Sequence, residues 1–539
     1  MSKKTFLKGA VVLGVAGLIV QVMGAIFRIP LANIIGDAGM GYYQTAYPIY
    51  IFLLVFSTNG APAAISKMTS ERIAIGNRTE AHRVFRLSFI LMFGLGIVAS
   101  SIFFFGAAHI VELLKNPGAY YSMIAIAPAL LFVPIMAVYR GYYQGLQEME
   151  PTAVSQLVEQ AVRVAVGLGL AIALIPRGVE FAAAGASFGT SVGPVAGTIV
   201  LLVLYYRRKH KLLSSFSQDT VHVRESAGRI LLKLATIAVP ITIGVSILPI
   251  MNIVDVSIVM RRLQETGFSA AEANALYGQL SGMAGPIINI PQALAMSIAL
   301  SLVPAVAAAK SVGDDAFLRQ NISLGFRTSV IIGVPCTFGL MALAGPIMNL
   351  IYPMQAESAA SGAESLFILS VGIVFLAVAQ TMAGIIQGLG RPAVAVVTLL
   401  IGVAVKAVAT YFLAGIPALN IQGAAIGSTL AYATVGILNF AIVKYQTKTH
   451  FDLQLSLARP LAAGLAMTAG VAAVYFVFIR IVGANLSTVL AVAAGAAIYG
   501  VTLILNRGIS ASEIRMLPKG EKMYRILVKL RLVKTDGLE

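Results

Sequence analysis

One stretch of the sequence, residues 152–175, reads TAVSQLVEQAVRVAVGLGLAIALI. It is long enough to cross a bilayer as a helix, since a span needs about 20 mainly apolar residues. Glu159 and Arg163 are its charged residues. A charge inside the membrane costs about 3 kcal/mol or more on insertion scales, so such residues are functional candidates. The stretch therefore predicts a transmembrane helix with two candidate functional residues.

Similar apolar runs recur along the whole chain, and we count about fourteen in all. The others lie at about 5–28, 42–66, 84–108, 120–143, 180–206, 230–259, 277–305, 325–351, 363–388, 392–414, 420–443, 459–481 and 485–506. The 539 residues are 58% hydrophobic and only 11% charged, a composition that a water-soluble fold hardly tolerates. The runs are continuously apolar and do not alternate, so they indicate helices and not barrel strands. The predicted class is an all-α polytopic membrane protein.

The second half of the chain repeats features of the first half. Three features recur in the same order: Gln-Gly-Leu at 144–146 and 387–389, a basic residue at Arg163 and Lys406, and a small-residue segment at 185–190 and 423–428. The first two recur at an offset of 243 residues and the third at 238. Copies that are six spans apart have the same orientation in the membrane. We therefore predict two parallel six-helix repeats, related by a pseudo-two-fold axis along the membrane normal, plus two C-terminal helices.

This duplication divides the chain into five expected parts. They are an N-terminal lobe, a cytoplasmic linker, a C-terminal lobe, an accessory pair of helices and a basic cytoplasmic tail, at 1–210, 211–228, 229–445, 446–506 and 507–539. The axis implies a central cavity that opens to either side as one lobe rocks against the other. A receptor or a membrane enzyme has no evident need of this symmetry. We therefore expect a transporter and not an enzyme.

The net charge of +17 is concentrated in one set of loops. If the N-terminus is cytoplasmic, the inner loops hold most of the basic residues, and the outer loops hold Lys115, Arg177, Arg261, Arg262 and Arg480. This positive-inside pattern places both termini in the cytoplasm of a cell-membrane protein, and it gives no indication of nucleic acid. The tail at 507–539 either lies as a helix on anionic headgroups or is a solvated topology anchor.

The composition gives no indication of a metal or another cofactor. Cys336 is the only cysteine, and the five histidines share no helical spacing. Since the chain has no tryptophan, tyrosines are expected to form the aromatic belt at the membrane interfaces. These are Tyr42, Tyr43, Tyr47, Tyr142, Tyr143, Tyr205 and Tyr206.

The N-terminal part carries a longer signature. Arg28 closes the first span, GDAGMGYY follows at 36–43, and NGAPAAIS follows at 59–66. With these motifs, nearly the whole chain resembles the multidrug/oligosaccharidyl-lipid/polysaccharide (MOP) exporter superfamily. Within it, the chain resembles the MurJ-like lipid-linked oligosaccharide flippases of the stage V sporulation protein B and YtgP type. The resemblance implies a flippase that moves undecaprenyl-pyrophosphate-linked cell-wall precursors, lipid II above all, from the inner to the outer leaflet.

The chain departs from the Gram-negative MurJ pattern at two places. Leu53 and Leu54 stand where those proteins carry paired arginines, and Gly278 and Gln279 stand where they carry Asp-Arg. A substrate-contact role is therefore carried over for Arg28 alone. Peptidoglycan biosynthesis, cell shape and sporulation are the processes that the resemblance implies.

Five ionisable residues form the candidate site: Arg28, Glu159, Arg163, Asp255 and Lys406. Arg163 and Lys406 lie near mid-span at matching places, so both are expected to face the cavity and attract a pyrophosphate. Glu159 and Arg163 share one helix face at i and i+4. They are expected to form an internal ion pair or to bind substrate, and the two roles are not exclusive, because such a pair can open when an anion competes for the arginine. Arg28 either snorkels to the interface or contacts the substrate.

Asp255 has a role that only the resemblance implies. Some MurJ-type flippases bind a sodium ion between an aspartate of span seven and polar groups of spans eleven and twelve. Here Lys406 lies on span eleven, so its ammonium group would pair with Asp255 and take the place of sodium. The resemblance therefore argues against transport coupled to sodium, or in favour of transport coupled to protons.

Two alternative functions remain open. One is a cation-coupled multidrug exporter, or an exporter of another polysaccharide precursor, of the same superfamily; the basic candidates argue against cationic drugs. The other is an envelope-assembly scaffold, which would tolerate alanine at Arg163 and Lys406. The expected partners are the lipid-linked oligosaccharide and membrane lipids, and we expect a monomer.

Overall fold

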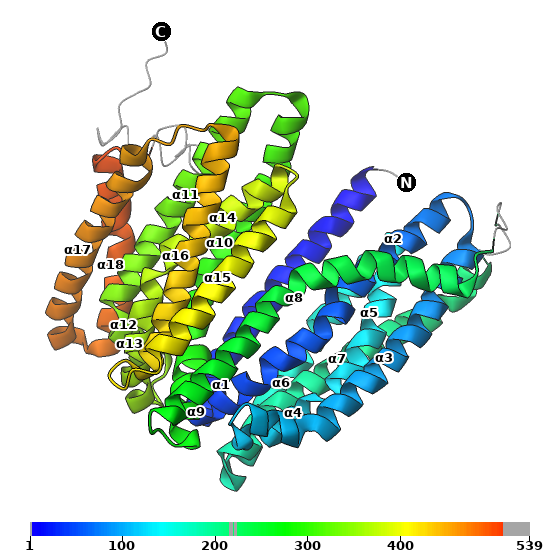
Figure 1. Cartoon of the computed structure of the whole chain (residues 1–539), viewed down its shortest axis with the longest axis horizontal. Helices are drawn as coiled ribbons and strands as arrows, with labels where there is room; N and C mark the ends of the chain where they lie inside the picture. The colour runs from blue at the N-terminus through cyan, green and yellow to red at the C-terminus, as the bar shows by residue number, and fades with distance from the viewer. Residues whose placement is uncertain (1–2, 215–218, 220–223, 510–539) are drawn as a thin grey trace. The chain divides into compact units, whose positions relative to one another are not determined.

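A computed structural model describes residues 3–214, 219 and 224–509, and every regular element in this part of the chain is a helix (Figure 1). The chain groups into two compact units, 1–283 and 284–539. The first contains α1 (Lys3–Val55), η1 (Phe56–Gly60), α2 (Ala61–Ala74), α3 (Arg78–Leu113), η2 (Pro117–Ala119), α4 (Tyr120–Ile126), α5 (Ala129–Gly145), α6 (Glu150–Leu174), η3 (Ile175–Arg177), α7 (Val179–Ser214), α8 (Ala227–Glu265) and α9 (Ala270–Tyr277).

The π-helical segment η5 (Gly278–Ala284) contains the boundary between the two units. The second unit contains α10 (Gly285–Val312), α11 (Asp315–Ala342), α12 (Ala344–Ile351), α13 (Ala356–Val371), α14 (Ile373–Gly388), α15 (Pro392–Leu413), α16 (Asn420–Thr447), η6 (Gln454–Ala458), α17 (Arg459–Val482) and α18 (Ala484–Leu505).

The lengths of these helices fit a membrane protein. Eleven of those described are long and apolar enough to cross a bilayer, or thirteen if each of two bent pairs is one span. The bent pairs are Ala227–Ile243 with Val245–Glu265, at 46°, and Ala356–Val371 with Ile373–Gly388, at 44°. The all-helical polytopic membrane class is thereby confirmed. The count of fourteen spans and the repeat symmetry stay predictions.

The first unit contains a sharp reversal of the chain within α1. Gly36 has φ 68° and ψ −173°, a backbone conformation that glycine adopts without strain. Asn116 ties the chain beyond this point in place, because its side-chain amide donates to Thr45 Oγ1 at 2.9 Å and to Asn274 Oδ1 at 2.8 Å. Asn274 in turn donates to the carbonyl of Ala38 at 2.8 Å. The GDAGMGYY motif thus forms a reversal that buried amides hold against α9.

Close helix packing recurs beside the two matching basic residues, one in each unit. In the first unit, a β carbon placed on Gly189 of α7 would lie 2.7 Å from the carbonyl oxygen of Arg163 in α6. In the second unit, a β carbon on Gly427 of α16 would lie 2.5 Å from Thr410 Oγ1 and 3.3 Å from the carbonyl oxygen of Lys406 in α15. Only glycine allows approaches this close, so each basic residue lies on a tightly packed helix pair.

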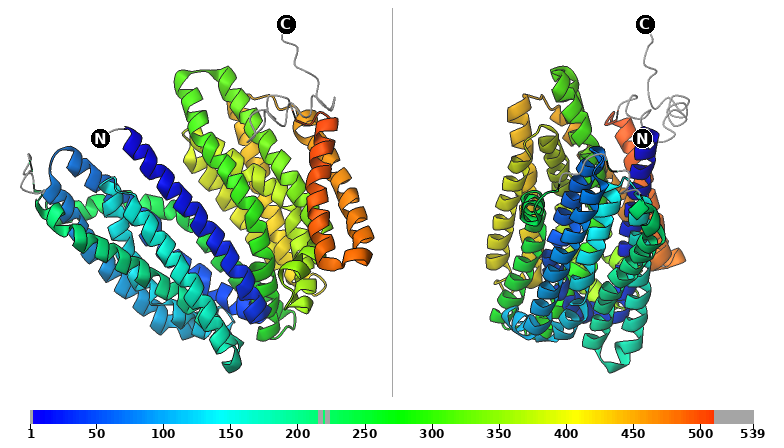
Figure 2. Two further views of the ribbon diagram at one scale, coloured as in Figure 1. Left: turned by 180° about the vertical axis from the view of Figure 1, so that it is seen from behind. Right: turned by 90° about the vertical axis from the view of Figure 1, so that its right-hand side faces the viewer.

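The Gln-Gly-Leu motifs also occupy matching places within their own units. The first motif ends α5 and the second ends α14. A β carbon on Gly145 would lie 2.6 Å from Thr69 Cβ in α2, and one on Gly388 would lie 2.8 Å from the carbonyl oxygen of Val303 in α10. In the second unit, α17 and α18 pack side by side and cover α11 (Figure 2).

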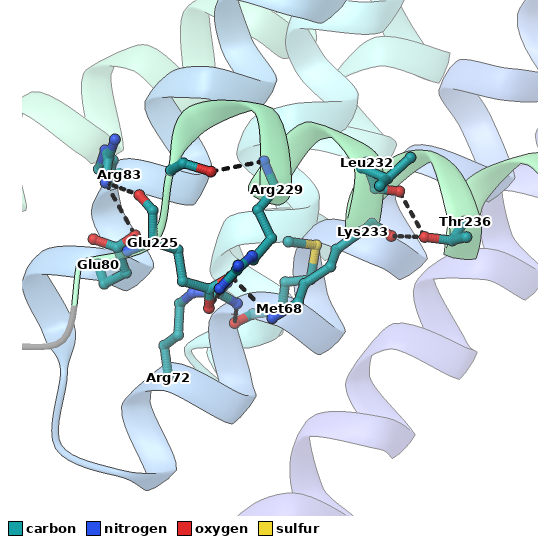
Figure 3. A network of polar contacts seen from close by, with 10 residues as sticks. Met68, Arg72, Glu80, Arg83, Glu225, Arg229, Leu232, Lys233 and Thr236 are labelled. Carbon is teal, nitrogen blue, oxygen red and sulfur yellow. Dashed lines mark hydrogen bonds and ion pairs between the residues drawn. The ribbon is translucent and has the colours of Figure 1, made fainter.

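Charged residues connect the start of α8 to α2 and α3 in the first unit (Figure 3). Glu225 accepts from Arg72 Nη2 at 2.8 Å and from Lys233 Nζ at 2.9 Å, and its backbone amide donates to Glu80 Oε1 at 3.1 Å. Arg83 donates to the backbone carbonyl of Glu225. These contacts, together with the packing of α8 on α1, α2 and α3, place α8 in the first compact unit.

The boundary between the compact units therefore differs in position from the expected linker. It lies at 283/284, whereas the sequence indicates a linker at 211–228. The difference arises because α8 packs against α1, α2 and α3 of the first unit. The division into functional lobes at 1–210 and 229–445, with an accessory pair at 446–506, stays a prediction. Of the predicted tail at 507–539, the residues after 509 lie outside the described part of the chain.

We expect Glu225→Gln to lower the melting temperature of the purified protein by a few degrees at neutral pH. The Arg72 side chain is only 6% exposed, and the substitution removes its carboxylate partner. A hydrogen bond from Lys233, followed by the charge of Arg72, holds the pKa of Glu225 below its usual 4.5. A carboxyl group whose pKa is lower in the folded state than in the unfolded state stabilises the fold at pH values above its unfolded-state pKa. This contribution is lost as the pH falls through its folded-state pKa.

The difference in melting temperature between wild type and Glu225→Gln should therefore be constant near neutral pH and shrink below about pH 4.5. Glu71→Gln is the matched control, because the Lys67–Glu71 pair is 61% and 59% exposed and should contribute little. Equal effects of the two substitutions would contradict a stabilising role for Glu225.

Candidate functional site

Two guanidinium groups lie against the ring of Tyr47 in the first unit. Arg28 Cζ is 5.7 Å from the ring centroid, and Arg163 Cζ is 5.3 Å from it. In a straight helix, 19 residues of separation would place Arg28 and Tyr47 roughly 28 Å apart. Their contact therefore depends on the reversal at Gly36. The face of an aromatic ring carries partial negative charge, which attracts both cations.

Tyr43 connects Arg163 with the ring of Tyr47. Arg163 Nη2 donates to Tyr43 Oη at 3.1 Å. The rings of Tyr43 and Tyr47 stack at 5.5 Å with an interplanar angle of 18°, and Phe27 packs edge-on against Tyr43 at 6.4 Å. We call Arg28, Tyr43, Tyr47 and Arg163 the arginine–tyrosine cluster. It is built from both arms of α1 and from α6, which packs against α1.

The prediction that seven tyrosines lie at the membrane interfaces is wrong for several of them. Tyr43 and Tyr142 are 1% exposed, Tyr143 is 0% exposed and Tyr205 is 8% exposed, so these side chains lie inside the first unit. The reason is tertiary: Tyr43 packs against the cluster, whereas Tyr142 and Tyr205 pack around Phe85, at 4.7 and 5.5 Å between ring centroids. Tyr206, by contrast, is 62% exposed.

Glu159 pairs with Arg140 and not with Arg163. Arg140 Nη2 donates to Glu159 Oε2 at 2.8 Å, and Arg140 Nε donates to Ser155 Oγ at 2.9 Å. The internal ion pair of α6, one of the two interpretations of the i and i+4 spacing, is therefore not formed. Arg140 is not among the five sequence candidates, although its charge within the apolar run at 120–143 is visible in the sequence.

The arginines of the cluster keep their positive charge uncompensated within the described residues. In that part of the chain, no carboxylate lies within the 4.0 Å ion-pair distance of Arg28 or Arg163. The Nε–H of Arg163 is buried and has no hydrogen-bond acceptor among the same residues. Guanidinium groups bind phosphate oxygens through paired hydrogen bonds. The cluster can therefore bind an anion.

The other two candidates lie outside this cluster. Asp255 is half-buried in α8, within the first unit. Lys406 is 7% exposed in α15, within the second unit. Pairing of Asp255 with Lys406 therefore stays a prediction. Among the described residues, no group of three His, Cys, Asp or Glu side chains is placed to hold a metal ion.

Known proteins are similar to this chain in sequence and in fold. Residues 6–310 match the model of a family described as polysaccharide biosynthesis protein. Stage V sporulation protein B of Bacillus subtilis (strain 168) is 28% identical over 527 residues, which cover 96% of this chain and 98% of that protein. Lipid II flippase MurJ of the same organism is 28% identical over 457 residues, which cover 82% of this chain and 83% of that protein.

Two solved structures show the same fold at low identity. An inward-facing multidrug resistance MATE family transporter of the MOP superfamily has a TM-score of 0.68 at 14% identity, covering 82% of this chain and 98% of its own. Lipid II flippase MurJ in an inward closed conformation has a TM-score of 0.66 at 12% identity, covering 92% and 99%. The chain therefore shares the fold of these two proteins, and the family match at 6–310 together with the two Bacillus subtilis relatives confirms the resemblance to stage V sporulation protein B and MurJ-like proteins.

We expect inorganic pyrophosphate to bind the purified protein and raise its melting temperature. Arg28→Gln and Arg163→Gln should each weaken the affinity about tenfold, because each removes a charged hydrogen-bonding group. The double variant should lose the shift. Arg480→Gln, an exposed arginine of α17, is the control and should behave as wild type. A shift that persists in the double variant would exclude the cluster as the anion site.

Proposed function

The chain belongs to the polysaccharide biosynthesis protein family and shares the fold of a MOP superfamily transporter, and on this premise we propose that it is a flippase for a lipid-linked cell-wall precursor, lipid II above all. The precursor is undecaprenyl-pyrophosphate-linked and passes from the inner to the outer leaflet by alternating access, without covalent chemistry. The arginine–tyrosine cluster is the observation that carries the proposal. It offers two guanidinium groups that no carboxylate of the described residues neutralises.

The chemistry of a pyrophosphate headgroup matches this cluster. Guanidinium groups bind phosphate oxygens in a planar, two-pronged geometry, and electrostatic attraction is stronger in a membrane protein interior than in water. The names of two relatives, a lipid II flippase and a stage V sporulation protein, support a precursor of the cell envelope. We further propose that Arg28 and Arg163 contact the pyrophosphate directly.

The proposal extends to the second unit through the repeated features. Lys406 is buried in α15, and Gly427 of α16 approaches its backbone closely. Gly189 of α7 approaches the backbone of Arg163 in the same way. We propose that the two basic residues face one cavity from parallel six-helix repeats. We also propose fourteen spans with both termini in the cytoplasm. The 63-residue span Val12–Ala74 supports this count, because Gly36 divides it and its length suffices for two crossings.

One alternative has support from the fold. The likeness to a MATE family transporter fits a cation-coupled multidrug exporter or an exporter of another polysaccharide precursor. A cationic drug would be repelled by Arg28 and Arg163, and Glu159 is already paired with Arg140 at 2.8 Å. The observed charges therefore favour an anionic substrate over a cationic one.

Complementation tests the proposal. Expression of the chain should restore growth to a bacterium that is depleted of its lipid II flippases, and Arg163→Ala and Lys406→Ala should reduce the rescue strongly at equal expression. Arg480→Gln should rescue as wild type does. Failure of the well-expressed wild type would favour another polysaccharide precursor. Full rescue by both alanine variants would favour an envelope-assembly scaffold.

Sodium dependence tests the proposed role of Asp255. We expect equal thermal stability and equal transport in sodium and potassium buffers, because we propose that the ammonium of Lys406 supplies the positive charge of a coupling ion. Both properties should be compared between wild type and Asp255→Asn in the two buffers. Stabilisation or transport that requires sodium, and that disappears in Asp255→Asn, would overturn this role of Lys406.

A further inference from the structure

We infer that Arg140 is a positioning residue that holds Glu159 away from Arg163 and thereby sets the charge that the arginine–tyrosine cluster presents to an anionic headgroup. The inference rests on the proposed function. It concerns a residue that lies outside the cluster and acts on it through Glu159.

The sequence of α6 by itself favours a different pairing. Glu159 and Arg163 are one turn apart on the same face, with the glutamate on the N-terminal side, which is the favourable order for an i and i+4 ion pair. In an isolated helix these two side chains would attract each other. The structure instead places the Glu159 carboxylate 2.8 Å from Arg140 Nη2 of α5. A tertiary contact has therefore replaced the local one.

The geometry around Arg140 explains why the tertiary contact prevails. Its guanidinium spans one turn of α6, because Nε donates to Ser155 Oγ while Nη2 donates to Glu159. Ser155 Oγ donates its own hydrogen to the carbonyl of Thr152 at 2.8 Å, so its lone pairs are available to Arg140. The Arg140 and Glu159 side chains are 14% and 22% exposed, so water screens this pair only partly.

Helix α7 restricts the backbone and side chain of Glu159 from the other side. A β carbon on Gly193 would lie 2.7 Å from the carbonyl oxygen of Glu159 and 3.5 Å from its Cγ. A β carbon on Gly197 would lie 3.3 Å from Glu159 Cβ. The glutamate thus lies between the closely packed glycines of α7 and the guanidinium of Arg140, which fixes its carboxylate in the contact with α5.

This arrangement determines the charge of the cluster. With Glu159 bound by Arg140, both Arg28 and Arg163 present a full positive charge to an incoming anion. If Glu159 paired with Arg163, one of the two charges would be neutralised, and an anion would have to displace the carboxylate. Arg140 therefore increases the affinity for an anion without touching it.

Binding of inorganic pyrophosphate to three variants of the full chain tests the inference. Arg140→Gln should weaken the affinity about tenfold relative to wild type, because Glu159 is released to pair with Arg163. The double variant Arg140→Gln/Glu159→Gln should bind nearly as tightly as wild type, because the released carboxylate is gone. Arg208→Gln is the matched control, since it breaks an Arg–Glu pair with Glu148 outside the cluster, and its affinity should equal that of wild type.

The outcomes separate the inference from the proposed function. Wild-type affinity in Arg140→Gln would overturn the inference and leave the anion site intact. A double variant that binds as weakly as Arg140→Gln would also overturn it, because a merely structural role of Arg140 predicts no rescue. If the wild type does not bind pyrophosphate, the anion site itself is wrong, and the inference fails with it.

Discussion

The reversal of α1 at Gly36 is the constraint on which the candidate site depends. It brings Arg28, before the turn, against Tyr47, after it, and it presents Tyr43 to Arg163 of α6. The buried amides of Asn116 and Asn274 hold the second arm in place. Without the left-handed glycine and these amides, the ring and its two guanidinium groups would lie on separate parts of the bundle.

The charged side chains within the helices of the first unit have two kinds of partner. The Arg140–Glu159 pair satisfies both of its charges internally, and loss of either partner would leave the other charge buried and unpaired. The arginines of the cluster instead lie against aromatic rings and a phenolic oxygen, which attract a cation without cancelling its charge. This difference distinguishes a charge that is neutralised within the fold from one that remains available to a ligand.

The sequence was sufficient to predict the membrane class and to select Arg28 and Arg163. These predictions need only local information, since a charge in an apolar run is visible from composition. The partner of Glu159 was not predictable in the same way. Helix periodicity offers Arg163 one turn away, whereas the observed contact with Arg140 depends on how α5 packs against α6. The sequence likewise indicates an interfacial position for Tyr43, and this prediction is wrong because the burial of the ring depends on the chain reversal at Gly36. Lys406 and Asp255 remain candidates on the evidence of the sequence.

The close approach of Gly189 to the carbonyl of Arg163 has a consequence for how such a protein can evolve. A larger residue at Gly189 would push α7 away from α6 and displace the backbone that carries the arginine, even though the arginine itself is unchanged. Gly427 stands in the same relation to Lys406. The positions of both basic residues are therefore restricted by residues that have no side chain to offer a ligand. In this fold, the space available for adaptation is limited by helix spacing as much as by the chemistry of the site.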